Sequence, residues 1–323
     1  MSYANYIRLE SSLKERTGAR RPDGGFAVKR SLLMMTAILL FATAICAAGV
    51  DMAVSTAWLA DHQKDAGLIA LHVGVDRKAY DAGHVPGARF VQMSDITLVR
   101  SGVPNQTPSA EDIKKTFERL GVGDGSTVIA YGDGPLLASE VYFLLDYVGH
   151  QNHAILDGGL AKWKAEKREV TAVVPEFKPA TLTVKAHPEL LVDFAAMQKI
   201  VADKSPLVLD SRPPEQYSGA TAGDAVVRAG HIPGAKNVFW QKTLTADGEL
   251  KPVNEIRAAY EAAGVKPGSQ VIAYCRTGMM AKHTYFTLKM AGFKPVVYDA
   301  SFMEWSKTDT AKVVTGADAN CCF

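Results

Sequence analysis

The sequence predicts an α/β protein built from two tandem copies of one domain. Residues 83–88, Gly-His-Val-Pro-Gly-Ala, recur at residues 230–235 with isoleucine in place of valine. Residues 128–131, Val-Ile-Ala-Tyr, recur unchanged at residues 271–274. A chain of 323 residues is also long enough for two domains of roughly 100–150 residues each. Because an internal repeat sets the architecture, both copies should share one fold.

Each copy alternates short apolar strands with amphipathic helices. In the second copy, Leu207–Asp210 and Gln270–Tyr274 are brief apolar runs of the kind found in parallel strands that are covered on both faces. Helices are expected at Val253–Ala263, which Gly264 ends, and at Met279–Met290. This order predicts an open, mostly parallel sheet in each copy, with helices on both faces.

The repeat and its flanks divide the chain into six segments. The region between the copies is rich in Val, Thr and Lys and contains three prolines, so it reads as a linker. We expect a basic cytosolic segment at 1–30, an apolar helix at 31–50, the first copy at 54–168, the linker at 169–188, the second copy at 189–315 and a tail at 316–323.

The apolar stretch at residues 31–50 contains no charged residue and follows a basic flank that includes Arg20, Arg21, Lys29 and Arg30. This is the positive-inside pattern, which leaves the N-terminus in the cytosol and sends the rest of the chain across the membrane. Its length is closer to a membrane span of about 20 residues than to a signal-peptide core of about 7–15. We therefore expect an exported protein on the periplasmic side, anchored by this helix. A cleaved signal and a buried core helix are the alternatives.

Composition and cysteine count narrow the class of protein. Hydrophobic residues make up 47% and charged residues 22%, which is typical of a folded globular protein. A net charge of +2 does not indicate a nucleic-acid-binding protein. Of the four cysteines, Cys46 lies in the apolar stretch and Cys321 and Cys322 lie in the tail, so there is no disulfide framework. Cys275 is therefore a solitary thiol in the folded part.

Cys275 lies between a predicted strand and a predicted helix, at the edge where open α/β sheets bind ligands. Backbone N–H groups of a short, glycine-containing loop and the positive end of the helix dipole favour an anion there, such as a thiolate. A thiolate is a nucleophile that needs no histidine base. The alternative is that Cys275 is only a small apolar side chain that packs at the end of the strand. The first copy argues against it, because residues 132–137, Gly-Asp-Gly-Pro-Leu-Leu, lack both the thiol and the following cation. The second copy is expected to be active and the first to be scaffold.

The repeated Gly-His-Ile/Val-Pro-Gly-Ala turns, the segment Asp210-Ser211-Arg212 and a six-residue loop that opens Cys-Arg-x-Gly resemble the tandem-domain rhodanese sulfurtransferases. The resemblance covers about Val54 to Val314. It implies a thiosulfate sulfurtransferase whose C-terminal copy carries the reacting cysteine. Cys275 would take the sulfane sulfur of thiosulfate as a persulfide, release sulfite and pass the sulfur to cyanide or a thiol. Its partners would be a small-molecule sulfur donor and a thiophilic acceptor, and no cofactor or metal is expected.

The substrate oxyanion needs cations and backbone donors. A guanidinium forms paired hydrogen bonds with an oxyanion, which makes arginines next to the loop the first candidates. We expect substrate to be bound by Arg212 and by the loop residues Arg276, Thr277, Gly278, Met279 and Met280. For Arg212 the alternative is a structural ion pair with Asp210 or Glu215.

Three other functions share parts of this pattern. Many thiosulfate enzymes of the family carry lysine where this chain has Thr277, whereas mercaptopyruvate-directed relatives show Cys-Gly-Ser-Gly, which Arg276 does not fit. Thiosulfate is therefore preferred, with 3-mercaptopyruvate sulfurtransferase as an alternative. A membrane-tethered carrier that delivers persulfide to a protein partner is also open, as is the oligomeric state. A cysteine phosphatase is disfavoured, because Ala281 occupies the position of its phosphate-binding arginine and the loop is one residue shorter.

Five further residues are given structural or surface positions. His84 and His231 recur in both copies, as do Trp163 and Trp305, so all four are predicted to be structural. Lys282, in the first turn of the helix after the loop, could face the mouth of the substrate site or solvent, and we predict that it faces solvent.

Overall fold

The computed structural model describes residues 50–316. Almost all of the apolar stretch at 31–50, the basic segment before it and three cysteines (Cys46, Cys321 and Cys322) lie outside the described residues, so the expected N-terminal helix is not among the elements below. Within residues 50–316, no helix is long and apolar enough to cross a membrane.

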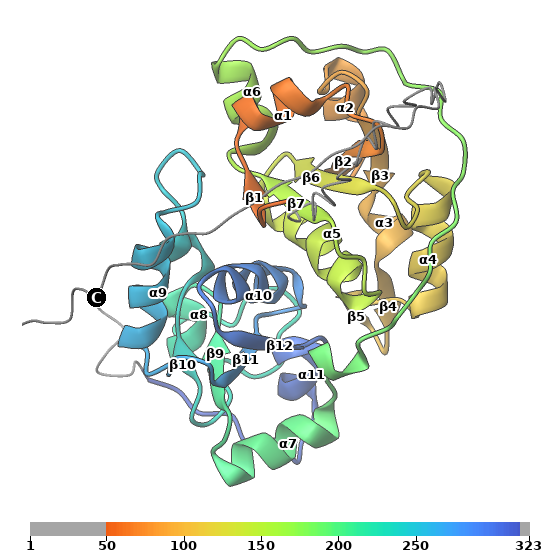
Figure 1. The fold of residues 1–323 in the computed structure, drawn as a ribbon. Coiled ribbons are helices and arrows are strands. Elements are labelled where there is room, and N and C mark those ends of the chain that lie inside the picture. Colours follow the sequence, from red (N-terminus) through yellow and green to blue (C-terminus); the bar gives the residue numbers. More distant parts are fainter. Residues whose placement is uncertain (1–49, 317–323) are drawn as a thin grey trace, which may run out of the picture. The chain divides into compact units, whose positions relative to one another are not determined.

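The first copy is built on a parallel sheet with the strand order β1-β7-β6-β2-β3. Its strands are β1 (Ala53–Val54), β2 (Leu68–Gly74), β3 (Arg89–Gln92), β6 (Thr127–Gly132) and β7 (His153–Leu156). Its helices are α1 (Thr56–His62), α2 (Lys78–Ala82), α3 (Met93–Ile96), α4 (Ala110–Arg119), α5 (Pro135–Tyr147) and α6 (Gly159–Ala165). A small antiparallel hairpin of β4 (Leu98–Arg100) and β5 (Val103–Gln106), absent from our predictions, projects from this copy (Figure 1).

The second copy repeats this plan. Its sheet, read from the equivalent edge, has the parallel order β8-β12-β11-β9-β10. Its strands are β8 (Leu191–Val192), β9 (Leu207–Asp210), β10 (Lys236–Asn237), β11 (Gln270–Tyr274) and β12 (Lys294–Tyr298). Its helices are η1 (Pro188–Leu190), α7 (Phe194–Asp203), α8 (Pro214–Ser218), η2 (Trp240–Thr243), α9 (Val253–Ala262), α10 (Met279–Met290) and α11 (Ser301–Lys307). The matching strand orders confirm the predicted pair of parallel-sheet domains.

Helices cover both faces of the second sheet, as its apolar strands predict. Successive residues of β11 point to opposite faces. Val271 packs with Ile256 and Tyr260 of α9 in one buried cluster. Ile272 packs with Phe302 of α11 in another. The strand is therefore buried on both sides and fixes where the residue after it lies.

The repeated tryptophans and histidines are structural, as predicted. Trp163 and Trp305 are each only 2% exposed. His84 stacks on the ring of Tyr80 and hydrogen-bonds its carbonyl through Nδ1. His231 does the same with Tyr217. Both histidines hold the start of a turn against the preceding helix.

The two copies pack as one compact unit. Helix α5 of the first copy packs directly against helix α10 of the second. The β4–β5 hairpin also reaches the second copy, where Gln106 and Thr107 contact Asp299. The segment after α6 runs beside the first copy before η1 (Figure 1), and its backbone is bonded to Tyr147 and Val148 at the end of α5. The copies therefore meet along α10, from Lys282, which pairs with Glu140, to Lys289, which pairs with Asp146, and the candidate site lies at the amino-terminal end of this helix.

Candidate active site

The strand ends place Cys275 at the carboxyl edge of the second sheet. β9 and β11 end in register, with Asp210 beside Tyr274. Cys275 follows immediately, and its residue is 1% exposed. Its Sγ accepts a hydrogen bond of 3.1 Å from the backbone N–H of Gly278, which caps helix α10. The sulfur thus lies at a helix N-terminus, where free N–H groups and the helix dipole favour negative charge.

The loop around Cys275 is held by the segment after β12. Ser301 Oγ accepts the N–H of Cys275 at 3.2 Å. The carbonyls of Cys275 and Arg276 accept the N–H groups of Phe302 and Met303, each at 3.0 Å. These two hydrogen bonds fix the orientation of the peptides that follow Cys275 and Arg276. The loop is therefore set by the fold before any substrate binds.

Gly278 is the residue that allows this turn. Its φ of +105° lies in a region that side chains rarely adopt. A Cβ at this position would also lie 2.9 Å from the carbonyl oxygen of Asp299. The glycine that the sequence suggested for the loop is thus needed for both its backbone angle and its close contact with the neighbouring strand end.

Arg276 lies on the outer side of the loop. Its side chain is 30% exposed, and its Nη1 donates to Oδ2 of Asp224 at 2.9 Å. The Asp224 side chain is 98% exposed, so this is a surface ion pair worth at most about 1 kcal/mol. An incoming oxyanion can therefore replace Asp224 at low cost. Of the other loop residues, Thr277 is buried and Met279 and Met280 are half-buried.

Arg212 has a different environment. It is fully buried, and its Nη2 donates to Asp210 at 2.5 Å and to the carbonyl of Gly230 at 2.8 Å. Its guanidinium also lies 4.0 Å from the centre of the Phe302 ring. This is the structural ion pair that the sequence left as the alternative for Arg212. The structure leaves Arg276 as the partly exposed cation of the loop.

The prediction that Lys282 faces solvent is wrong. Its side chain is fully buried, and its Nζ donates to Oε1 of Glu140 at 2.6 Å. Nζ also lies 3.6 Å from Oδ1 of Asp299 and donates to the carbonyl of Asn105 at 3.3 Å. Glu140 and Asn105 belong to the first copy, so the face of α10 that would be exposed in a single domain is covered by its neighbour.

Charge and burial oppose each other in this cluster. Burial raises the pKa of Glu140 to about 7, although Lys282 acts in the other direction. Burial alone would lower the pKa of Lys282, but the charges of Glu140 and Asp299 outweigh it and hold that pKa above its usual value. Lys282 is therefore a buried cation whose charge is maintained by the interface between the copies.

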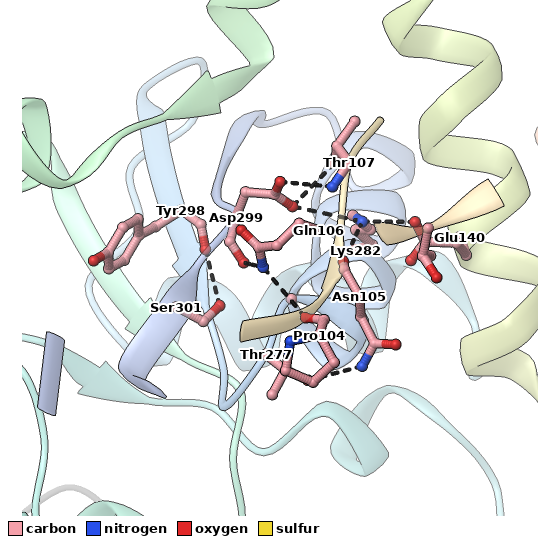
Figure 2. Close-up of polar contacts among 12 residues, drawn as sticks. Pro104, Asn105, Gln106, Thr107, Glu140, Thr277, Lys282, Tyr298, Asp299 and Ser301 are labelled. Atoms are coloured by element: carbon pink, nitrogen blue, oxygen red, sulfur yellow. Dashed lines mark hydrogen bonds and ion pairs between the residues drawn. The ribbon is translucent and has the colours of Figure 1, made fainter. Parts of the chain in front are cut away.

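The interface residues join the loop directly (Figure 2). Asn105 Nδ2 donates to Thr277 Oγ1 at 3.1 Å. Thr107 binds both carboxylate oxygens of Asp299, through its N–H at 2.8 Å and its hydroxyl at 3.0 Å. Sequence reasoning missed these contacts. For the contact with Thr107, the available sequence signal was Asp299, which matches Asp157 in the first copy.

The comparisons with known proteins agree with this architecture. A model of the rhodanese-like domain matches residues 55–166 and again residues 193–308. The chain belongs to the rhodanese family. Sulfur carrier protein TtuD of Thermus thermophilus is 32% identical over 285 residues, which cover 83% of this chain and 98% of TtuD. The proteins named "Putative thiosulfate sulfurtransferase" in Synechococcus elongatus and Mycolicibacterium smegmatis are 34% and 32% identical, over 89% and 83% of this chain and 92% and 99% of their own lengths.

Solved structures share the rhodanese fold over the same region. The anaerobic ergothioneine biosynthesis enzyme from Chlorobium limicola superposes with a TM-score of 0.75 and 21% identity, covering 83% of this chain and 71% of that one. The crystal structure of YnjE gives a TM-score of 0.73 and 23% identity, with coverages of 83% and 69%. At these identities the likeness concerns the fold.

The first rhodanese copy carries an altered loop at the equivalent place. Gly132 and Asp133 follow β6 where Cys275 and Arg276 follow β11. Helix α5 then begins with Pro135, which lacks a backbone N–H. This position therefore has neither the thiol nor the cation, and it has fewer donors for an anion.

Proposed function

We propose that the protein is a sulfurtransferase that moves the sulfane sulfur of thiosulfate to cyanide or to a thiol through a persulfide on Cys275. The observation that carries the proposal is the buried Cys275 sulfur at the N-terminus of α10, 3.1 Å from the Gly278 nitrogen. Arg276 supplies a positive charge at the outer side of the same loop.

The geometry supports a double displacement. The Cys275 thiolate attacks the outer sulfur of thiosulfate, a new S–S bond forms, and the old S–S bond breaks with its electron pair leaving on sulfite. The acceptor then attacks the outer sulfur of the persulfide, and the Cys275 thiolate is released. Backbone N–H groups of the loop stabilise the sulfur anion in both steps, and Arg276 is placed to bind the sulfonate oxygens.

Relatives favour the same chemistry and also a second candidate. Two proteins named for thiosulfate sulfurtransferase match nearly the whole described region, which favours thiosulfate as the donor. TtuD is named as a sulfur carrier, which favours transfer from Cys275 to a protein partner as the second candidate. Steady-state release of thiocyanate from thiosulfate and cyanide separates the two, because a carrier that needs its protein partner turns over slowly with cyanide.

Mass spectrometry tests the proposed intermediate. After the protein is mixed with thiosulfate and the excess is removed, the peptide that contains Cys275 should gain the mass of one sulfur atom. A dithiol wash should remove that mass. An unmodified Cys275 peptide, or the added sulfur on another cysteine alone, would contradict the proposal.

Arg276→Ala should raise the KM for thiosulfate and leave the folded structure intact. A hydrogen bond to a charged group contributes about 1.5–3 kcal/mol, so kcat/KM should fall about ten- to hundredfold. The unfolding midpoint should stay near that of the wild type, because the pair with Asp224 is exposed. Asp224→Asn is the matched control. It removes the negative charge that pairs with Arg276 and keeps Arg276 itself, so KM should stay equal or fall. An unchanged KM in Arg276→Ala would remove its substrate role.

We also propose that residues 31–50 anchor the protein in the inner membrane with its folded part on the periplasmic side. The support is the basic flank and the length of this uncharged stretch. Cell fractionation should find the full-length chain in the membrane fraction and release it only with detergent. A shortened chain in the soluble extract would show that the segment is cleaved.

A further inference from the structure

The contacts between the copies occur in two corresponding places. In the catalytic copy, Asp299 accepts the N–H of Thr107 from the first copy at 2.8 Å. In the first copy, Asp157 accepts the N–H of Leu250 from the second copy at 2.8 Å. Asp157 and Asp299 occupy matching positions after β7 and β12. Each copy thus extends a segment that binds the aspartate beside the other copy's loop. Because this contact occurs in both directions, it is a shared feature of the two copies and is not specific to the one with Cys275.

One contact lacks such a counterpart. Asn105 lies two residues before Thr107, and the residue two before Leu250 is Gly248. Thr277 lies two residues after Cys275, and the residue two after Gly132 is Gly134. The side-chain hydrogen bond from Asn105 to Thr277 therefore joins two positions that are both glycine on the non-catalytic side. The bond is specific to the side that carries the thiol.

The backbone conformation of Asn105 is one in which a side chain is unusual. Asn105 has a φ of +61°, in the left-handed region where a side chain is unfavourable, and Gly248 has a φ of +81°. Glycine is the ordinary residue for this conformation, and asparagine tolerates it better than most. The hairpin therefore carries a side chain where its backbone would accept glycine, and that side chain reaches the catalytic loop.

The hairpin is held firmly enough to position the loop. Lys282 Nζ donates to the carbonyl of Asn105, and Gln106 Nε2 donates to the carbonyl of Asp299 at 3.1 Å. Figure 2 shows these contacts around Asn105 on both sides of the interface. Thr277, the acceptor, is 5% exposed and precedes Gly278, whose N–H bonds the Cys275 sulfur.

We propose that Asn105, from the copy without a thiol, is a positioning residue for the Cys275 loop. Through Thr277 it holds the peptide that precedes Gly278, and so directs the Gly278 N–H at the sulfur. This inference rests on the proposed role of Cys275 as the nucleophile.

Asn105→Gly separates positioning from stability. Glycine fits the backbone angle, keeps the carbonyl that Lys282 binds and matches the residue at Gly248. The unfolding midpoint should therefore stay near that of the wild type. Loss of one hydrogen bond that orients the loop should slow reaction at Cys275 about five- to tenfold. Ser101→Gly is the matched control, because Ser101 has a φ of +51° in the same hairpin and is exposed.

Two rates are measured on the full-length chain, together with the unfolding midpoint. The first is alkylation by iodoacetamide, followed on the Cys275 peptide by mass spectrometry, and the second is persulfide formation with thiosulfate. Both should fall in Asn105→Gly and stay unchanged in Ser101→Gly. Thr277→Val should match Asn105→Gly, and the double variant Asn105→Gly/Thr277→Val should be no slower than Thr277→Val.

Several results would overturn the inference. Wild-type alkylation in Asn105→Gly would show that the bond does not orient the loop. A fall in both rates that is matched by a fall in the unfolding midpoint would reduce Asn105 to a structural role. A double variant slower than either single variant would mean that Asn105 acts by another route than Thr277. If the wild type forms no persulfide, the proposed function is contradicted. If alkylation of Cys275 is nevertheless slower in Asn105→Gly than in the wild type, the positioning role of Asn105 still stands.

Discussion

Cys275→Ser should abolish sulfur transfer. A serine hydroxyl is not ionised near neutral pH and forms no persulfide, so thiocyanate release should fall at least about a thousandfold. The hydroxyl still fits the buried position and still accepts the Gly278 N–H, so the unfolding midpoint should change little. The measurement is steady-state thiocyanate release, with thermal unfolding run in parallel.

The control for this variant replaces the other thiols. A triple variant with serine at Cys46, Cys321 and Cys322 leaves Cys275 as the remaining cysteine of the four in the chain. It should keep wild-type turnover and take up one sulfur from thiosulfate. Full activity in Cys275→Ser, or loss of activity in the triple variant, would assign the chemistry to another residue.

Among the variants proposed here, Lys282→Met should cause the largest fall in the free energy of unfolding. The variant removes a fully buried cation and leaves Glu140 without its partner. Breaking one side of a buried ion pair costs about 3–5 kcal/mol, and the free energy of unfolding should fall by that amount. Lys199→Met, on the exposed face of α7, is the control and should stay within about 0.5 kcal/mol of the wild type. Urea unfolding measures both.

The loss in Lys282→Met should depend on pH in one direction. Burial already raises the pKa of Glu140 from 4.5 to about 7, and removal of Lys282 raises it further. A carboxyl group whose pKa is raised by folding destabilises the folded state as pH rises from its unfolded value through its folded value. The variant should therefore lose more stability at about pH 8 than at about pH 5.5. Glu140→Gln in the same chain should restore part of the loss at the higher pH. A pH-independent loss would refute this account of Glu140.

Much of the fold followed from local pattern. The strand Gln270–Tyr274 and the helix Met279–Met290 lie where periodicity and glycine placed them. The internal repeat gave the tandem arrangement, because two similar halves must fold alike. Within the second copy, local sequence also placed Cys275 between a strand and a helix, since that relation involves neighbours in the chain.

The contacts between copies could not be predicted in this way. Lys282 and Glu140 are 142 residues apart, and nothing on α10 indicates that another domain covers that face. Whether Lys282 is exposed or buried depends on how the first copy packs on α10, and the sequence of α10 alone does not indicate this packing. For Arg212, the same three-residue segment fits either a substrate site or an ion pair with Asp210, and only burial distinguishes them. Asn105 lies in a hairpin without a motif, and comparison with Gly248 was its only sequence signal.

The duplicated aspartate contacts have a consequence for the history of the interface. In a symmetric homodimer every contact occurs twice, so neither side can change alone. The bonds to Asp157 and Asp299 have that relation inside one chain. Covalent linkage allows the two halves to differ in sequence, so the loop of one copy can lack the thiol while that copy still packs beside the loop of the other. The copy without a thiol can then serve as a permanent partner of the copy that carries Cys275.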